Sequence, residues 1–200
     1  MKFLLGVLIT LGSMGYAYAD PESDRTAFVK FYAERFSNVD MQDHKDGAYA
    51  LDKAKRAQWL EMEEFPPYEL AVDEGRALFS VPFSNGESYA SCFDDQGISV
   101  KQQFPKFDVA SNSVITLELA VNQCRQANNE PVLDYLGDEM GYITAYMAFT
   151  SRGELFDIQV PDAGLAAYEQ GKQFFYERRG KLDFACSSCH MTAAGNSLRA

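Results

Sequence analysis

The stretch Cys186-Ser187-Ser188-Cys189-His190, near the end of the 200-residue chain, matches the CxxCH signature of c-type haem attachment. Two cysteines at this spacing can each form a thioether with the same porphyrin. The imidazole of the next residue, His190, can then bind the iron as an axial ligand. We therefore expect one covalent haem c, held by Cys186, Cys189 and His190, in a fold that is mainly α.

The same cysteine spacing also occurs in disulfides, in half of a zinc site and in thioredoxin-like redox motifs. A zinc site needs two further ligands of similar type nearby, and none follows the motif in the sequence. A thioredoxin-like motif lies in a βαβ unit, whereas the residues before Cys186 have a helical pattern. The sequence therefore favours haem attachment.

Residues 1–19 have the organisation of a cleavable signal peptide. Lys2 gives a positive N-terminal end, a short apolar run follows it, and Ala17-Tyr18-Ala19 matches an A-x-A cleavage site. The apolar run is too short to span a bilayer, and no other stretch approaches the needed length. We expect a protein of the periplasm without a membrane span, in a compartment where disulfides persist.

The composition is that of a folded, acidic protein. Hydrophobic residues make up 46% of the chain and aromatic residues 14%, which is enough for a substantial core. The formal net charge is −11, and removal of Lys2 with the signal would change it to −12. This surplus of acidic residues argues against nucleic acid and anionic membranes as partners.

Residues 20–67 carry apolar side chains at helical spacing and predict two amphipathic helices. Ser23 or Asp24 is the expected cap of the first helix, and Gly47 precedes the second. His44, between the two helices, is expected in a solvated loop. The aromatic residues on one face of the first helix, which we expect to pack in the core, are Phe28, Phe31, Tyr32 and Phe36.

Helical patterns later in the chain predict three more helices. They extend from a cap at Asn112 or Ser113 through Cys124, over residues 136–149, and over residues 163–178.

Two stretches of the chain resemble each other, Glu74-Gly75-Arg76-Ala77-Leu78-Phe79 and Gln170-Gly171-Lys172-Gln173-Phe174-Phe175. Each has a glycine, then a cation, then an aromatic residue four positions after the glycine. Each continues through an Xaa-Gly turn to a cysteine, which predicts one structural unit used twice, with chance similarity as the alternative. Tyr89 and Phe93 take the places of the first thioether cysteine and the iron ligand. The first copy is therefore expected to be haem-free.

The repeat predicts tandem cytochrome c-like domains. Residues 1–19 are the signal peptide, residues 20–158 form a haem-free cytochrome c-like domain, and residues 159–200 begin a haem-binding cytochrome c domain. We expect the second domain to be truncated in this chain, because the first copy continues much further past Cys92 than the second does past His190.

Two cysteines lie outside the haem motif, Cys92 and Cys124. A unit that lost its haem also lost a large apolar disc, and a cross-link can help to stabilise what remains. We expect these cysteines to form a disulfide, with two buried free thiols as the alternative.

Basic residues gather around the haem motif in an otherwise acidic chain. These residues are Lys172, Arg178, Arg179 and Lys181, with Glu177 the one acid among them. The plainer interpretation is solvated side chains and cations paired with haem propionates. The sharper interpretation is a local positive entrance for a small anion.

The run from Gly171 to Cys189 resembles the SoxA subunits of the SoxAX cytochromes of bacterial sulfur oxidation. Other motifs of that family occur in the same order: Phe104-Pro105-Lys106-Phe107, Cys124-Arg125, Ala145-Tyr146-Met147-Ala148 and Ser151-Arg152-Gly153. The resemblance covers most of the chain after the signal. Since Tyr89, Cys92 and Phe93 stand at the first site, it implies the single-haem type, which keeps a disulfide in the first domain.

This resemblance implies the haem c subunit of a periplasmic enzyme, an L-cysteine S-thiosulfotransferase, that joins thiosulfate oxidatively to a cysteine of the SoxYZ carrier. Electrons would pass through the haem to a SoxX cytochrome in a SoxAX heterodimer. The resemblance also implies a persulfide cysteine as the other axial ligand, with an arginine nearby. Both would lie beyond residue 200, so the catalytic residues are unknown from this chain.

Two other classes of protein are open at this point. A simple periplasmic electron-transfer cytochrome c, without catalysis of its own, needs only the haem and an exposed edge that meets a partner. A haem-free structural module would carry no covalent haem.

Overall fold

A computed structural model of the protein describes residues 20–196. The signal peptide expected at residues 1–19 lies outside the described residues. The described chain is mainly helical, as the sequence predicts, with one small antiparallel sheet. Its helices are α1 (Pro21–Arg35), α2 (Ala48–Leu51), α3 (Lys53–Met62), α4 (Glu69–Ser80), α5 (Leu117–Ala127), α6 (Asp138–Thr150) and α7 (Leu165–Tyr176), and its strands are β1 (Lys106–Asp108) and β2 (Ser113–Ile115).

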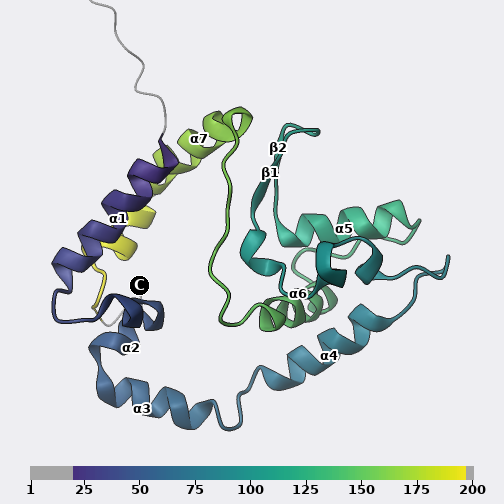
Figure 1. The fold of residues 1–200 in the computed structure, drawn as a ribbon, viewed down its shortest axis with the longest axis horizontal. Helices are drawn as coiled ribbons and strands as arrows, with labels where there is room; N and C mark the ends of the chain where they lie inside the picture. Colours follow the sequence, from purple (N-terminus) through teal and green to yellow (C-terminus); the bar gives the residue numbers. More distant parts are fainter. Residues whose placement is uncertain (1–19, 197–200) are drawn as a thin grey trace, which may run out of the picture.

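Figure 1 shows these elements in two groups. Helices α1, α2, α3 and α7 lie together around the C-terminal end of the described chain. Helices α4, α5 and α6 form the other group with the two strands. The group that contains α1 is thus assembled from both ends of the sequence, and the α4–α6 group is inserted between them.

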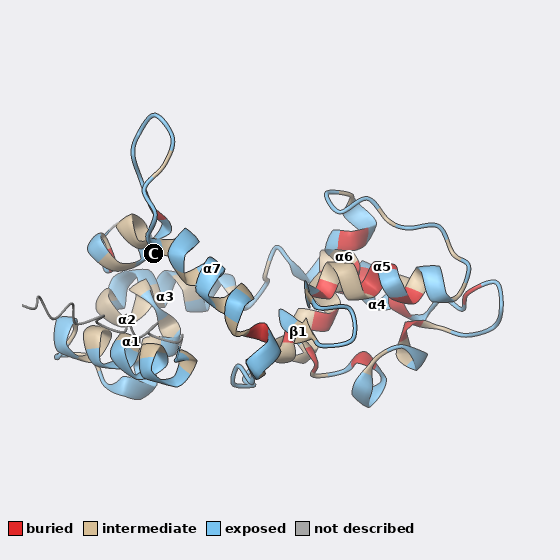
Figure 2. Ribbon diagram, turned by 90° about the horizontal axis from the view of Figure 1, so that it is seen from above, coloured by how far each residue is buried: buried red, intermediate tan, exposed pale blue. Residues whose placement is uncertain are grey.

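The buried core lies in the α4–α6 group, where Figure 2 shows most of the buried residues. Helices α4 and α6 pack against each other over much of their length. Burial of this apolar surface is the main term that stabilises the group. The core consists of Phe79, Phe83, Tyr89, Val100, Phe104, Ile115, Leu117, Val121, Cys124, Met140, Ile143 and Met147.

The crossing of α4 and α6 requires a glycine. A Cβ atom at Gly75 would lie 1.9 Å from the backbone oxygen of Tyr142, so no other residue allows this approach. Gly171 has the corresponding place in the predicted repeat, because each glycine is the seventh residue of a 12-residue helix. A Cβ atom at Gly171 would meet no described atom within 4 Å. Helices α4 and α7 thus carry a glycine at the same position. Within residues 20–196, another helix crosses closely at this glycine in α4 but not in α7.

Tyr89 occupies the core of the domain that we expect to be haem-free. Its side chain is 2% exposed, and its ring centroid lies 5.6 Å from that of Phe79 and 4.9 Å from that of Phe83. The hydroxyl accepts a hydrogen bond from the Arg125 guanidinium at 2.8 Å. Burial raises the pKa of the Tyr89 hydroxyl, and Arg125 opposes the rise. An aromatic cluster with a satisfied hydroxyl therefore fills this core.

The predicted disulfide between Cys92 and Cys124 is present, with 5.7 Å between the two Cα atoms. It joins the segment after Tyr89 to α5, and Cys124 is part of the core. The prediction is confirmed, and the alternative of two free thiols is wrong.

Near the N-terminus the predicted cap of α1 is wrong, and the second predicted helix begins after Gly47 as expected but is divided, because aspartate side chains cap the backbone. Asp20, rather than Ser23 or Asp24, caps α1, and its carboxylate accepts from the N–H of Ser23 at 3.1 Å. The single helix expected after Gly47 is broken into α2 and α3 at Asp52. That carboxylate accepts from the N–H groups two and three residues further on, both at 3.0 Å.

The cap expected at Asn112 or Ser113 is also wrong. Thr116 caps α5 and accepts from the N–H of Leu119 at 3.2 Å. Residues 113–115 form β2 instead, paired with β1. Val114 and Ile115 are β-branched, which favours a strand over the first turn of a helix.

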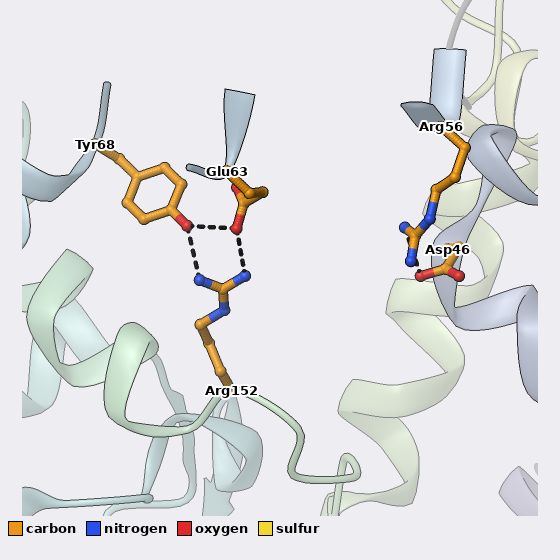
Figure 3. Close-up of polar contacts among 5 residues, drawn as sticks. All are labelled: Asp46, Arg56, Glu63, Tyr68 and Arg152. Carbon is orange, nitrogen blue, oxygen red and sulfur yellow. Dashed lines mark hydrogen bonds and ion pairs between the residues drawn. The ribbon is translucent and has the colours of Figure 1, made fainter. Parts of the chain in front are cut away.

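Arg152, just after α6, connects the core group to the segment between α3 and α4 (Figure 3). Its guanidinium donates to the carboxylate of Glu63 and to the hydroxyl of Tyr68, both at 2.7 Å. The Tyr68 hydroxyl donates to Glu63 at 2.8 Å. The hydrogen bond from Arg152 lowers the pKa of Glu63. Figure 3 also shows a separate ion pair within the other group, Asp46–Arg56 at 3.0 Å.

The connection from α6 to α7 spans residues 151–164 and exposes Leu155 and Phe156. The domain boundary predicted after residue 158 falls within this connection, and the division into domains stays a prediction. None of the helices among residues 20–196 combines the length and apolar character needed to cross a lipid bilayer.

Replacing Gly75 with alanine should lower the free energy of unfolding by about 1–3 kcal/mol or more, because the methyl group would overlap the α6 backbone. Urea unfolding followed by circular dichroism measures the change. The matched control is Gly141→Ala in α6, where a Cβ atom meets nothing described within 4 Å. This control should be neutral or stabilising by up to about 1 kcal/mol. Equal effects of the two substitutions would contradict the close crossing.

Replacing both Cys92 and Cys124 with alanine should lower the free energy of unfolding by about 3.5–4 kcal/mol, because the cross-link restricts the unfolded chain. Replacing both residues avoids leaving a lone thiol. Chemical denaturation of the variant measures the loss, and reduction of the unaltered protein by dithiothreitol should reproduce most of it. A double variant as stable as the oxidised protein would show that the disulfide adds no stability.

Candidate functional site

The haem-attachment motif lies on a short helical segment after Ala185. Cys186 begins the segment, and a π-helical turn, Ser188–Thr192, carries Cys189 and His190. The Ser188 hydroxyl accepts from the N–H of Ala185 at 3.0 Å and fixes the start of the turn. A helical turn is the local structure that brings two cysteines at this spacing to one side.

The three predicted haem-binding side chains are accessible and unengaged. Cys186 and Cys189 are free thiols, the first exposed and the second half-buried. The His190 imidazole is exposed, and the Phe175 ring lies beside it with 6.3 Å between ring centroids. Within residues 20–196, no hydrogen bond to that imidazole is found. Two free thiols and an available imidazole on one turn fit the donor set that a haem c requires.

Helix α1 holds the turn in place through backbone carbonyl groups. The Tyr32 hydroxyl donates to the carbonyl of His190. The Arg35 guanidinium donates to the carbonyls of Thr192 at 2.9 Å and Ala194 at 3.1 Å. These bonds join residues more than 150 positions apart, and they fix the backbone that carries His190, the predicted iron ligand. Sequence analysis assigned Tyr32 to core packing and missed Arg35 altogether.

A second set of contacts holds α1 against α7. The Asp24 carboxylate accepts from Lys172 at 2.8 Å and from the Tyr168 hydroxyl at 2.9 Å. The rings of Phe28 and Phe175 lie 6.0 Å apart between centroids. The aromatic face of α1 thus packs on α7, but its side chains are half-buried and no residue of α1 is fully buried. The core role predicted for this face is correct only in part.

Ionisable side chains at the contact between α1 and α7 have shifted pKa values. The hydrogen bond from Lys172 lowers the pKa of Asp24. Burial and the hydrogen bond to Asp24 raise the pKa of Tyr168 to about 12. Burial also raises the pKa of Tyr32. The Asp24–Lys172 pair therefore stays charged and Tyr168 stays neutral at ordinary pH, so the contact persists.

The four basic residues predicted near the motif separate into two places. Lys172 is turned to α1 by its bond to Asp24, whereas Arg178, Arg179 and Lys181 lie in the loop after α7. Two of these three have acidic partners: Arg178 pairs with Asp183 at 3.0 Å and Arg179 with Glu177 at 3.5 Å. A positive entrance for an anion stays a prediction, with the loop as its place.

An apolar cavity of about 370 Å³ lies behind the turn, between α1, α2 and the chain after the motif. His44 lines it, half-buried, and its Nε2 atom is buried without a hydrogen-bond partner in the described chain. The expectation of a solvated loop histidine is wrong, because the Phe36 ring lies 6.5 Å from the imidazole and shields it. The other main lining residues are Phe28, Tyr32, Val39, Met41, Ala48, Leu51, Ala194 and Gly195.

Gly195 packs closely at the edge of this cavity. A Cβ atom at Gly195 would lie 2.7 Å from the Phe36 ring and 2.9 Å from Leu51, and the backbone φ of +82° favours glycine as well. The chain after the haem motif is therefore fitted against both α1 and α2.

Comparison with protein-family models and solved structures supports a cytochrome. The family model "SoxA/TsdA, cytochrome c domain" matches residues 74–156. The structure is similar to one chain of the crystal structure of SoxXA from P. pantotrophus, with a TM-score of 0.59 and 27% identity. That match covers 68% of this chain and 53% of the matched chain.

Curated relatives carry the name "L-cysteine S-thiosulfotransferase subunit SoxA". The protein of Chlorobaculum tepidum is 47% identical over 180 residues, which cover 90% of this chain and 63% of that protein. The protein of Allochromatium vinosum is 41% identical over 204 residues, which cover 98% of this chain and 72% of that protein. By this identity over most of both sequences, the chain belongs to the SoxA family.

Proposed function

We propose that this chain is the haem c subunit of a periplasmic enzyme that oxidatively joins thiosulfate to a cysteine of the SoxYZ carrier. The observation that carries the proposal is the turn with free thiols at Cys186 and Cys189 and an accessible imidazole at His190. The SoxA family supports the reaction, because its curated relatives are named L-cysteine S-thiosulfotransferase subunits.

Each residue of the turn has a separate task in this proposal. Cys186 and Cys189 would hold the porphyrin through two thioethers, which would keep it from dissociating. His190 would bind the iron through a neutral imidazole nitrogen. Tyr32 and Arg35 donate to the carbonyls of His190 and Thr192, and so they fix the backbone from which the imidazole extends. When bound, the haem supplies an acceptor for single electrons.

The reaction forms a sulfur–sulfur bond between thiosulfate and the carrier thiol, and it releases one proton and two electrons. We propose a SoxX cytochrome as the partner that takes the electrons, in a heterodimer with this chain. The similarity to a chain of the SoxXA structure supports this choice. The loop with Arg178, Arg179 and Lys181 is the proposed place where anionic thiosulfate approaches, because focusing by local charge outweighs the acidic total.

A simple periplasmic electron-transfer cytochrome c is the second candidate. The exposed imidazole of His190 and the free thiols of Cys186 and Cys189 fit it as well, because such a protein needs the haem alone. Family membership favours the enzyme over this alternative.

Expression in the periplasm with haem-maturation factors should give one covalent haem per chain, seen in the intact mass and in the pyridine haemochrome spectrum. The variant Cys186→Ala/Cys189→Ala should lose covalent haem, because both thioethers are removed. The matched control Cys92→Ala/Cys124→Ala should keep it, because those cysteines pair with each other. Haem of equal amount and linkage in the first variant would rule out the site.

The haem-loaded, full-length protein should attach thiosulfate to the carrier when it is mixed with the SoxX cytochrome, reduced SoxYZ and thiosulfate. Mass spectrometry of the carrier should show a thiosulfonate adduct on its cysteine, and the haem band should change as electrons arrive. Haem reduction without any carrier adduct, at several ratios of the proteins, would favour the simple electron-transfer cytochrome.

A further inference from the structure

The loop that follows α4 contains the one Asn-Gly pair of the sequence, Asn85-Gly86. Both residues are exposed, and they lie in a tight turn in which the N–H of Phe83 donates to the carbonyl of Glu87 at 2.7 Å. Gly86 has a φ angle of +87°, which favours glycine at this position. Asparagine before glycine loses its side-chain amide more readily than before other residues, because glycine has no side chain to hinder the reaction.

This loss of an amide is deamidation, and water is the only other reactant. The backbone nitrogen of Gly86 gives up its proton and forms a bond to Cγ of Asn85, while the side-chain nitrogen of Asn85 leaves as ammonia. Water then opens the resulting five-membered ring at either of its two carbonyl carbons. The product is aspartate or isoaspartate, with a new negative charge and a mass increased by about 1 Da.

Hydrogen bonds occupy the groups that must react. The side-chain nitrogen of Asn85, which would leave, donates to the side-chain oxygen of Asn128 at 2.8 Å. The side-chain oxygen of Asn85 accepts from the N–H of Glu87 at 3.0 Å. The N–H of Gly86, which would attack, donates to the carbonyl of Phe83 at 2.9 Å. The rate of deamidation therefore depends on how often these bonds open.

Asn128 holds Asn85 from outside the loop. It is the half-buried residue that ends α5, and its side-chain nitrogen donates to the carbonyl of Cys124 at 2.9 Å. The same nitrogen lies 3.6 Å from the sulfur of Cys92. Contacts with α5 and with the disulfide thus fix the Asn128 amide, and its oxygen is the acceptor for Asn85.

A carboxylate at position 85 would weaken the attachment of the loop to the end of α5. The carboxylate of Glu130 accepts from the N–H and the hydroxyl of Ser84 at 2.7 and 2.6 Å. These hydrogen bonds lower the pKa of Glu130, so its charge persists at ordinary pH. A second negative charge on the next residue of the loop would repel it. A carboxylate also has no N–H group to donate to the oxygen of Asn128.

We propose that Asn85-Gly86 is a deamidation site and that the side chain of Asn128 suppresses the reaction in the folded protein. Modification is slow while Asn128 holds the Asn85 amide, and it becomes faster when the loop opens. Since the product carboxylate loosens the same contact, a modified molecule does not return to the original loop structure. This inference is independent of the proposed function, because it concerns the α4–α6 group alone.

The test incubates the haem-loaded, full-length protein in mildly alkaline buffer and measures the modified fraction at position 85 by peptide mass spectrometry. The unaltered protein should deamidate there about tenfold or more slowly when folded than in urea, because three hydrogen bonds must open. Asn128→Ala should raise the rate in the folded protein about 2- to 10-fold, the factor expected for the loss of one hydrogen bond. The matched control Gln126→Ala, which changes an exposed amide in the same helix, should leave the rate unchanged.

A variant that carries the product gives a second measurement, without any incubation. Asn85→Asp should speed hydrogen exchange at the backbone N–H groups of residues 128–130, because the loop no longer holds the end of α5. The matched control Asn112→Asp, in the turn between β1 and β2, should leave exchange at those residues unchanged. Thermal unfolding of each variant shows whether an effect is local or comes from a general loss of stability.

Each outcome supports or overturns a stated part of the inference. No deamidation at position 85, even in urea, would overturn the site. Equal rates in the folded protein and in urea would overturn the protection by the fold. Equal rates in Asn128→Ala and the unaltered protein, or an equal increase in Gln126→Ala, would overturn the role of Asn128. None of these results bears on haem attachment or on thiosulfate transfer, so the proposed function is tested separately.

Discussion

The site depends on side-chain hydrogen bonds to backbone carbonyl groups at the end of the haem motif and just after it. A short helical turn leaves its last carbonyls without partners inside the turn. Tyr32 and Arg35 supply the missing donors from α1 to His190, Thr192 and Ala194. His190, the predicted iron ligand, therefore sits on a backbone that is bonded to a separate helix, and α1 is in turn held against α7 through Asp24.

The two halves of the predicted repeat show two ways to complete one helix–turn unit. In the first, α6 crosses α4 at Gly75, Tyr89 fills the centre and a disulfide joins the segment after Tyr89 to α5. In the second, the corresponding helix keeps its glycine, the cysteines are free, and the imidazole of His190 is accessible. A packed aromatic core and a cross-link thus stabilise the unit that has no haem residues. The other unit keeps the three residues that are predicted to bind haem.

Sequence alone could predict the parts of the structure that local chemistry decides. The pairing of Cys92 with Cys124 follows because they are the cysteines outside the CxxCH motif, whose three donors stay a prediction. Helix starts were predicted less well, because Asp20, Asp52 and Thr116 compete as caps with neighbours of similar type. The bonds from Tyr32 and Arg35 could not be predicted, since nothing in α1 identifies carbonyl groups at the other end of the chain. His44 was misplaced because its charged neighbours suggested solvent, whereas Phe36 covers it.

The separation in sequence between α1 and the turn that it supports affects the order in which the protein can fold. The α4–α6 group is continuous in sequence and contains its own core, so it can condense while later residues are still being made. Helix α1 comes first in the chain but lacks its partners until α7 and the haem motif have emerged. Helix α1 therefore stays in contact with solvent until almost the whole described chain has been made. During that time its aromatic face, which later packs on α7 through Phe28, has no cover and is open to aggregation.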